Sequence, residues 1–125
     1  LSLSCMITQV IEMEKIVEQG LLYDFYGELL TPHQQQIYED VVINDMSLSE
    51  IAQDKGISRQ GVYDLVRRCD KILAGYEEKL KLVEKFQKTK IMVAEIEQLT
   101  AEYQKPGDNG LVERIGQISR DIAKL

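Results

Sequence analysis

The chain has 125 residues, 44% of them hydrophobic and 29% charged, and a formal net charge of −6. A chain of this length can bury one modest core, and no apolar run approaches the ~20 residues that a membrane-spanning helix requires. The composition therefore excludes a membrane-spanning protein and predicts a soluble, cytoplasmic one.

Candidate residues for catalysis or metal binding are scarce. The single histidine, His33, stands among glutamines, and Cys5 and Cys69 are too far apart for a CxxC pair. The glycines form neither GxGxxG nor GxxxxGK. The sequence predicts no enzyme, no metal site, no cofactor and no disulfide framework. We interpret Cys69 as a small core residue and His33 as a solvated or capping residue.

The first predicted helix begins at Met13. Residues 1–12, LSLSCMITQVIE, lack the basic and long apolar parts of a secretory signal and are interpreted as an N-terminal extension outside the core, with Met13 as an alternative beginning. From Met13 to Leu30, apolar residues recur at three-and-four spacing, which predicts an amphipathic helix. Its apolar stripe is Ile16, Val17, Gly20, Leu21, Leu22, Phe25, Tyr26, Leu29 and Leu30.

A second helix is predicted from TPHQ, which reads as a capping box. Thr31 is the N-cap, Pro32 occupies the first helical position and Gln34 reaches back to the cap. The helix should end near Asn44 and Asp45. The inward-facing residues are Ile37, Tyr38, Val41 and Val42.

Two further start signals lie close together in SLSEIAQDKGISRQGVYDLVRR, residues 47–68. Ser47 and Glu50 form a second capping box, and Gly56 falls where a left-handed residue closes a short helix. Ser58 can then cap the next helix. The short helix buries Leu48, Ile51 and Ala52, and Ile57 anchors the turn. This spacing is typical of a helix-turn-helix.

The helix after Ser58 divides into two faces at about 100° per residue. The core face carries Val62, Leu65, Val66 and Cys69. The outward face carries Arg59, Gln60, Tyr63, Asp64 and Arg67. Because caps, small residues and apolar anchors agree in register, we favour the DNA-binding type of helix-turn-helix over a purely structural corner.

Charge is distributed unevenly along the chain. Residues 1–54 carry one basic and ten acidic residues, net −9, whereas residues 55–90 carry ten basic and five acidic, net +5; residues 91–125 have net −2. The basic segment begins at the predicted recognition helix, where phosphate contacts would need it. The alternative is a solvated face held by pairs such as Asp64 with Arg68.

Two resemblances follow from these motifs. Residues 58–73, SRQGVYDLVRRCDKIL, resemble region 4 of bacterial sigma factors, which recognises a promoter element. Residues 21–73, with YDFY, LLT, SLSEIA and SRQGVYD, resemble the YlxM family of small bacterial helix-turn-helix proteins. The resemblance implies an all-α, sigma-region-4-like fold and a link to the signal recognition particle pathway. Gly61, where alanine is expected, and residues 1–12 depart from the family pattern.

The leading hypothesis is a DNA-binding regulator, with double-stranded DNA as its partner. The predicted nucleic-acid-binding residues are Ser58, Arg59, Gln60, Tyr63, Asp64 and Arg67. The alternative is a non-DNA-binding accessory factor that binds protein or RNA components of the signal recognition particle pathway. The acidic net charge and the family resemblance favour that alternative.

The C-terminal part predicts a helical hairpin. The recognition helix meets no stop signal before QKPGDNG, so we expect it to continue to that point. Its stripe is Leu82, Phe86, Thr89, Val93, Ile96, Thr100 and Tyr103, and that of the last helix is Leu111, Ile115, Ile118, Ile122 and Leu125. We expect an extension (1–12), a helix-turn-helix domain (13–75) and a hairpin (76–125) that forms a homodimer. Alternatively, the stripe packs on residues 13–45 of its own chain.

Overall fold

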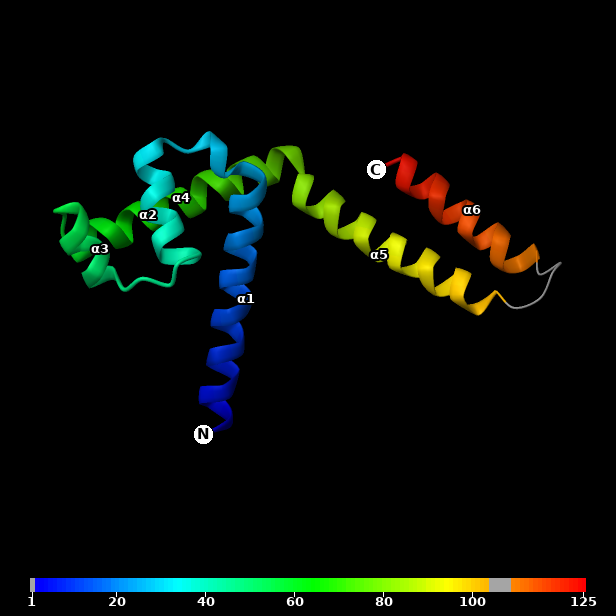
Figure 1. Ribbon diagram of the computed structural model, residues 1–125, viewed down its shortest axis with the longest axis horizontal. Helices are drawn as coiled ribbons and strands as arrows, with labels where there is room; N and C mark the ends of the chain where they lie inside the picture. The colour runs from blue at the N-terminus through cyan, green and yellow to red at the C-terminus, as the bar shows by residue number, and fades with distance from the viewer. Residues whose placement is uncertain (1, 104–108) are drawn as a thin grey trace. The chain divides into compact units, whose positions relative to one another are not determined.

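The computed structural model describes residues 2–103 and 109–125, and no strand occurs in these ranges. The prediction of an all-α fold is confirmed (Figure 1). The helices are α1 (Leu3–Tyr26), the 3-10 turn η1 (Gly27–Leu29), α2 (Pro32–Val42), α3 (Leu48–Lys55), α4 (Arg59–Leu80), α5 (Leu82–Glu102) and α6 (Asn109–Ala123). The chain divides into two compact units, Leu1–Lys81 and Leu82–Leu125. None of the described helices is both long and apolar enough to cross a membrane.

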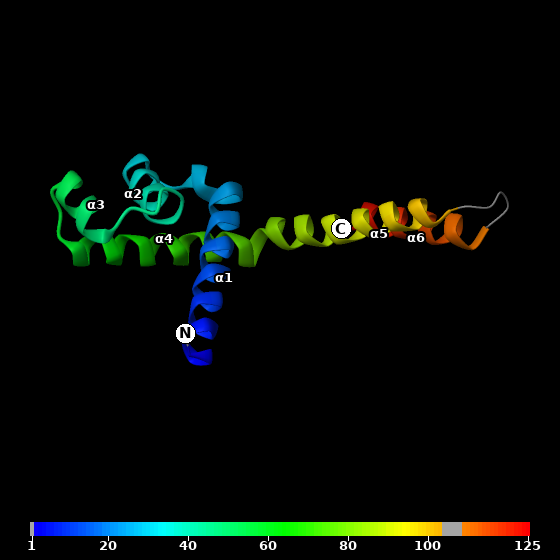
Figure 2. The ribbon, with the colours of Figure 1, turned by 60° about the horizontal axis from the view of Figure 1, so that its bottom comes forward.

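Helix α1 begins before the predicted start at Met13. Ser2 caps it, because its hydroxyl oxygen accepts a hydrogen bond from the Cys5 amide at 3.2 Å. The predicted apolar stripe is covered only in part: Ile16 and Val17 are exposed, and burial begins at Leu22. The N-terminal end of α1 extends beyond α2, α3 and α4 in both views (Figures 1 and 2). The predicted stripe is therefore right for Gly20, Leu21, Leu22, Tyr26 and Leu30, and wrong for Ile16, Val17, Phe25 and Leu29, which are exposed.

The core of the first unit lies where α2 and α3 meet α4. Six side chains have no exposed surface: Ile37, Tyr38, Ile51, Val62, Cys69 and Leu73. Leu22 and Tyr26 from the second half of α1 complete this core. Burial of such side chains is the main force that holds a small helical unit together.

Asp70 of α4 forms hydrogen bonds with side chains of α1 and α2. Its carboxylate accepts hydrogen bonds from the Tyr38 hydroxyl of α2 at 2.7 Å and from the Gln19 amide of α1 at 3.0 Å. Burial, and then the neighbouring Asp70 carboxylate, raise the pKa of the Tyr38 hydroxyl well above its ordinary value. These bonds fix where α1 crosses α4.

The predicted caps are largely observed. At Thr31 both bonds of the capping box form, and Pro32 occupies the first helical position. At Ser47 only half of the box forms. The Ser47 hydroxyl oxygen accepts from the Glu50 amide at 3.1 Å, but the Glu50 carboxylate accepts from that hydroxyl instead of from the Ser47 amide. A two-way capping box at Ser47 was therefore a wrong prediction, although Ser47 is the N-cap.

The predicted uninterrupted helix from residue 59 to the QKPGDNG segment was also wrong. Helix α4 ends at Leu80, and Lys81 adopts a left-handed conformation with φ 57° and ψ 28°. The Lys81 amide closes the helix by donating to the Glu77 carbonyl at 2.9 Å. A left-handed lysine has no sequence signature comparable to glycine, so the local pattern did not reveal this end.

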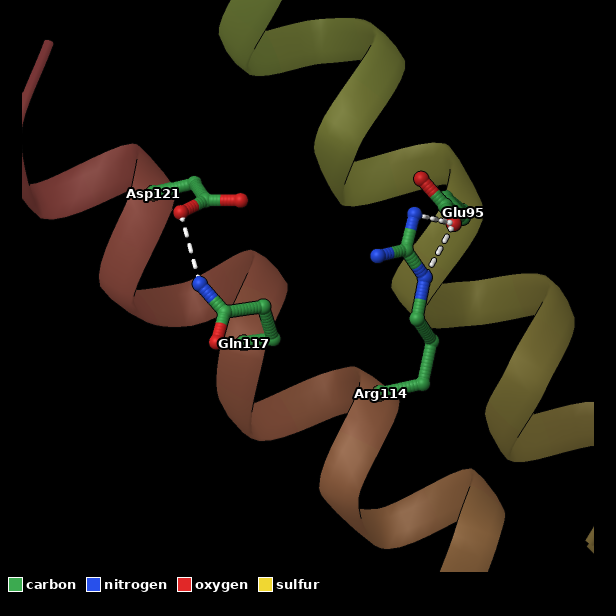
Figure 3. Close-up of polar contacts among 4 residues, drawn as sticks. All are labelled: Glu95, Arg114, Gln117 and Asp121. Carbon is green, nitrogen blue, oxygen red and sulfur yellow. Dashed lines mark hydrogen bonds and ion pairs between the residues drawn. The ribbon is translucent and has the colours of Figure 1, made fainter.

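The second unit is a hairpin of α5 and α6, joined by an ion pair. Arg114 of α6 donates two hydrogen bonds to Glu95 of α5, at 2.9 and 3.1 Å (Figure 3). On α6 the predicted stripe is right for four residues: Ile118 is 2% exposed, and Leu111, Ile115 and Ile122 are half-buried. Leu125, the fifth member, is exposed. The predicted break at residues 106–108 lies outside the described residues. Residues 109 and 110, also assigned to the break, belong to α6.

On α5 the covered face is rotated from the predicted stripe. The half-buried apolar or hydroxyl side chains on this face are Thr89, Met92, Ile96 and Leu99. The exposed members of the predicted stripe are Leu82, Phe86, Val93, Thr100 and Tyr103. The prediction was therefore right for Thr89 and Ile96 only. A four-three repeat could be drawn along two overlapping faces of this helix, and only the position of α6 decides which one is covered.

Candidate nucleic-acid interface

The corner between α3 and α4 is closed by Gly56. Its φ of 67° and ψ of 30° lie in the left-handed region that glycine adopts without steric cost. The amides of Gly56 and Ile57 both donate to the Ala52 carbonyl, the latter at 3.1 Å, so the end of α3 keeps its hydrogen bonds. This is the helix-turn-helix geometry expected from the sequence.

The start of α4 explains why residue 61 is glycine. Ser58 caps the helix, with its hydroxyl oxygen accepting from the Gly61 amide at 2.9 Å. A Cβ at position 61 would lie only 3.1 Å from that same oxygen. Glycine costs about 1 kcal/mol of helix propensity against alanine. Glycine at position 61 avoids this close contact with the Ser58 hydroxyl oxygen in the first turn of the helix.

The two faces of α4 lie as the sequence predicted. Val62 and Cys69 are fully buried, and Leu65 and Val66 are nearly so. All six predicted site residues are exposed, namely Ser58, Arg59, Gln60, Tyr63, Asp64 and Arg67. The structure therefore presents these side chains to an outside partner without disturbing the core.

The outward side chains gather around two shallow hollows. Arg59, Gln60 and Tyr63 line the first, of about 440 Å³, together with Leu48 at the start of α3. Asp64 and Arg67 line the second, of about 500 Å³, together with Gly61, Arg68 and Lys71. The predicted site thus occupies about three turns of α4, with its cations at both ends.

Two contacts order the side chains between these ends. The Gln60 amide donates to the Asp64 carboxylate at 3.0 Å, and the Arg67 guanidinium lies over the Tyr63 ring, 5.7 Å from its centre. Within the described residues, Asp64 forms no ion pair with Arg68, although the alternative of a solvated face expected one. Asp64 instead holds Gln60, so Arg68 stays available.

A third concavity contains a residue that sequence reasoning missed. A groove of about 660 Å³ lies between α1 and α4, and Tyr63 and Arg67 contribute to it. Its other lining residues are Glu12, Lys15, Ile16, Gln19, Val41, Leu48, Val66, Asp70 and Lys71. Lys15 is 52 positions before Arg67 in sequence, and its local pattern gave no sign of this proximity.

The residues considered for chemistry lie apart from this surface. His33 is exposed at the start of α2, and Cys69 is buried in the core as predicted. Across residues 2–103 and 109–125, no three histidine, cysteine or acidic side chains are grouped so that they could hold a metal ion. The candidate site therefore lies on the exposed face of α4, where cationic, amide, aromatic and hydroxyl side chains and one carboxylate are found together.

Comparison with known proteins gives a consistent result. Residues 13–109 match the family UPF0122, described as "Putative helix-turn-helix protein, YlxM / p13 like". Similar relatives are the UPF0122 proteins of Bacillus cereus strain AH187, Bacillus anthracis strain A0248 and Bacillus thuringiensis subsp. konkukian strain 97-27. Each is 38% identical over 113 residues, which cover 90% of this chain and 98% of the relative.

Proposed function

This chain belongs to the UPF0122 family of YlxM/p13-like helix-turn-helix proteins, and we propose that it is a regulator that binds double-stranded DNA through α4. The observation that carries the proposal is the outward face of α4, where three exposed arginines flank a tyrosine, a glutamine and one acidic residue. These arginines are Arg59, Arg67 and Arg68, none of which forms an ion pair within the described residues. The face combines base-reading and phosphate-binding side chains on one helix, behind which the core remains closed.

Five of the six predicted side chains have a direct role in this proposal, and Asp64 positions one of them, Gln60. Arg59 can address guanine, and Gln60 can address adenine through paired hydrogen bonds in the major groove. Ser58 and the N-terminus of α4 can hold a phosphate. The stack of Arg67 on Tyr63 limits the freedom of the guanidinium before binding, which lowers the entropy lost on contact.

The test begins with selection of binding sites from random duplexes. Arg59→Ala should lower affinity for the selected site by about 1 to 3 kcal/mol and relax its sequence preference. Lys71→Ala should weaken binding to all duplexes more evenly and reduce the salt slope by about one. Arg120→Ala, at an exposed arginine of the second unit, is the matched control and should bind like the parent. The absence of an enriched sequence, or unchanged binding by Arg59→Ala, would contradict the proposal.

A second candidate function is an accessory factor that binds protein or RNA of the signal recognition particle pathway. The net charge of −9 over residues 1–54 favours it, because this acidity opposes non-specific attraction to DNA. Binding to duplex DNA and to particle RNA should be titrated side by side at two salt concentrations. Tight binding to the RNA or its proteins, with no selected duplex, would favour this candidate over the first.

We further propose that the second unit joins two copies into a homodimer. Within the described part of its unit, helix α5 packs against α6 alone, and Phe86, Ile91 and Val93 are exposed. Val93→Asp should place an uncompensated charge in a self-association seam and halve the mass measured by light scattering. Ile118 is a poorer test position, because it is 2% exposed and aspartate there would disrupt the hairpin itself. An unchanged mass for Val93→Asp would exclude this seam.

A further inference from the structure

The groove between α1 and α4 has a positively charged rim whose residues come from distant parts of the sequence. Lys15 is the only basic residue in residues 1–54, yet the fold places it in one concavity with Arg67 and Lys71. All three side chains belong to exposed residues, and none forms an ion pair within the described residues. Arg67 does contact the Tyr63 ring, which leaves its charge available. Three cations therefore line one groove, and none of them is held in an ion pair within the described residues.

Two carboxylates line the same groove as the three cations. Asp70 also lines it, but its carboxylate already accepts bonds from Tyr38 and Gln19. Glu12 is the other carboxylate of the lining, and it is exposed. The lining thus carries three cations against two carboxylates, which leaves an excess of one positive charge. An anion is the ligand that such a rim attracts, and a duplex on the outward face of α4 would supply one.

We propose that Lys15, Arg67 and Lys71 form a binding site for the DNA backbone. In this site, Lys15 of α1 contacts a phosphate group. The proposal rests on the proposed DNA binding and adds a surface outside the helix-turn-helix. The position of α1 supports it, because Gln19, one turn after Lys15, is bonded to Asp70 of α4. Lys15 is therefore held beside the recognition helix by a fixed anchor. Phosphate contacts position a protein on the duplex without reading sequence.

The same geometry predicts that the two charged residues of α1 act in opposite directions. Lys15→Gln removes one cation from the rim and should weaken binding to every duplex. Glu12→Gln removes the carboxylate that opposes the rim and should strengthen binding. Both residues are exposed, so neither change should alter the fold.

The experiment measures affinity for a selected duplex and for a random-sequence duplex, using the full chain. Each phosphate contact contributes about 0.9 to the slope of log affinity against log salt concentration. A fourfold rise in salt concentration should therefore weaken DNA binding by Lys15→Gln about 3.5-fold less than it weakens DNA binding by the parent. Its preference for the selected duplex should stay unchanged, unlike that of Arg59→Ala. Lys124→Gln, an exposed lysine in the second unit, is the matched control and should keep the parent's slope. Lys15→Arg should restore the salt slope of the parent.

Separate outcomes bear on the site and on the proposed function. If the parent binds duplex DNA and Lys15→Gln keeps its salt slope, the backbone site is wrong while DNA binding stands. The site is also wrong if Glu12→Gln binds more weakly than the parent. If the parent binds no duplex at any salt concentration, both proposals fall together. A lower slope for Lys15→Gln with a higher affinity for Glu12→Gln supports the site.

Discussion

The helix-turn-helix unit and the C-terminal hairpin are both helical, but they bury their side chains to very different extents. In the first unit, six side chains from α2, α3 and α4 have no exposed surface. In the described part of the second unit, Val83 and Ile118 alone are buried. Two helices share one face, whereas a third and fourth helix can enclose a core from several sides. The comparison shows that similar apolar repeats lead to different burial, depending on how many neighbours the topology provides.

The largest expected contrast within the first unit is between its two thiols. Cys5 is exposed and should react with a thiol reagent at once, whereas the fully buried Cys69 should react only when the unit opens. The rate for Cys69 should therefore be lower by several orders of magnitude. Counting modified thiols against time tests this, and Cys5→Ser should abolish the fast phase. Rapid reaction of both thiols would show that this core is not closed.

Alkaline pH should weaken the same core. Burial, and then the Asp70 carboxylate, raise the pKa of the Cys69 thiol from 9.0 to about 11. A raised pKa means that the folded state holds the proton more tightly than the unfolded state. The stability contribution is therefore complete below pH 9 and is lost as pH rises toward about 11. Urea unfolding across this range should show a falling midpoint, and Cys69→Ala should make the fall smaller, with the remainder due to groups such as Tyr38.

A matched pair of isoleucines tests the difference in burial directly. Ile51→Ala, in the first unit, should cost about 2 to 5 kcal/mol, because the side chain is fully buried and leaves a cavity. Ile96→Ala, on the half-buried face of α5, should cost roughly 1 to 2 kcal/mol. Hydrogen exchange measured separately over α2–α4 and α5–α6 reports each loss. Equal losses would mean that the α6-facing side of α5 is covered more fully than the structure shows.

Two glycines of the first unit should respond in opposite directions. Gly56→Ala places a side chain at φ 67° and should destabilise the corner by about 1 to 2 kcal/mol. Gly75→Ala lies within α4, where an added methyl group meets nothing within 4 Å, and should stabilise by about 0.4 to 1 kcal/mol. Thermal unfolding of both variants checks the signs. Destabilisation by Gly75→Ala would mean that the space beside α4 is occupied.

The smallest effect is expected at the ion pair of the hairpin. Arg114→Ala removes the bonds to Glu95 (Figure 3), but both side chains remain partly exposed to solvent. The loss should therefore be about 0.2 to 1 kcal/mol. It should shrink at high salt, because ions screen exposed charges. At 1 M salt the electrostatic screening length is ~3 Å. A loss of stability that persists at this salt concentration would indicate that solvent ions do not reach the pair.

Much of the corner could be predicted from sequence because its signals are local. Thr31, Ser47, Gly56 and Ser58 each satisfy backbone groups within a few residues, so their roles follow from spacing alone. The outward placement of the predicted site residues follows in the same way from the periodicity of α4. The half-formed box at Ser47 escaped prediction, because the Glu50 side chain had two partners within reach.

The sequence by itself determined the all-α class, the caps, the turn at Gly56 and the two faces of α4, because each depends on contacts within one or two helical turns. The tertiary structure decided the end of α4 at Lys81, the exposure of Ile16 and Val17, and the covered face of α5. It also brought Lys15 beside Arg67. These features depend on which helices become neighbours, and a repeat of apolar residues does not encode which neighbour will cover it.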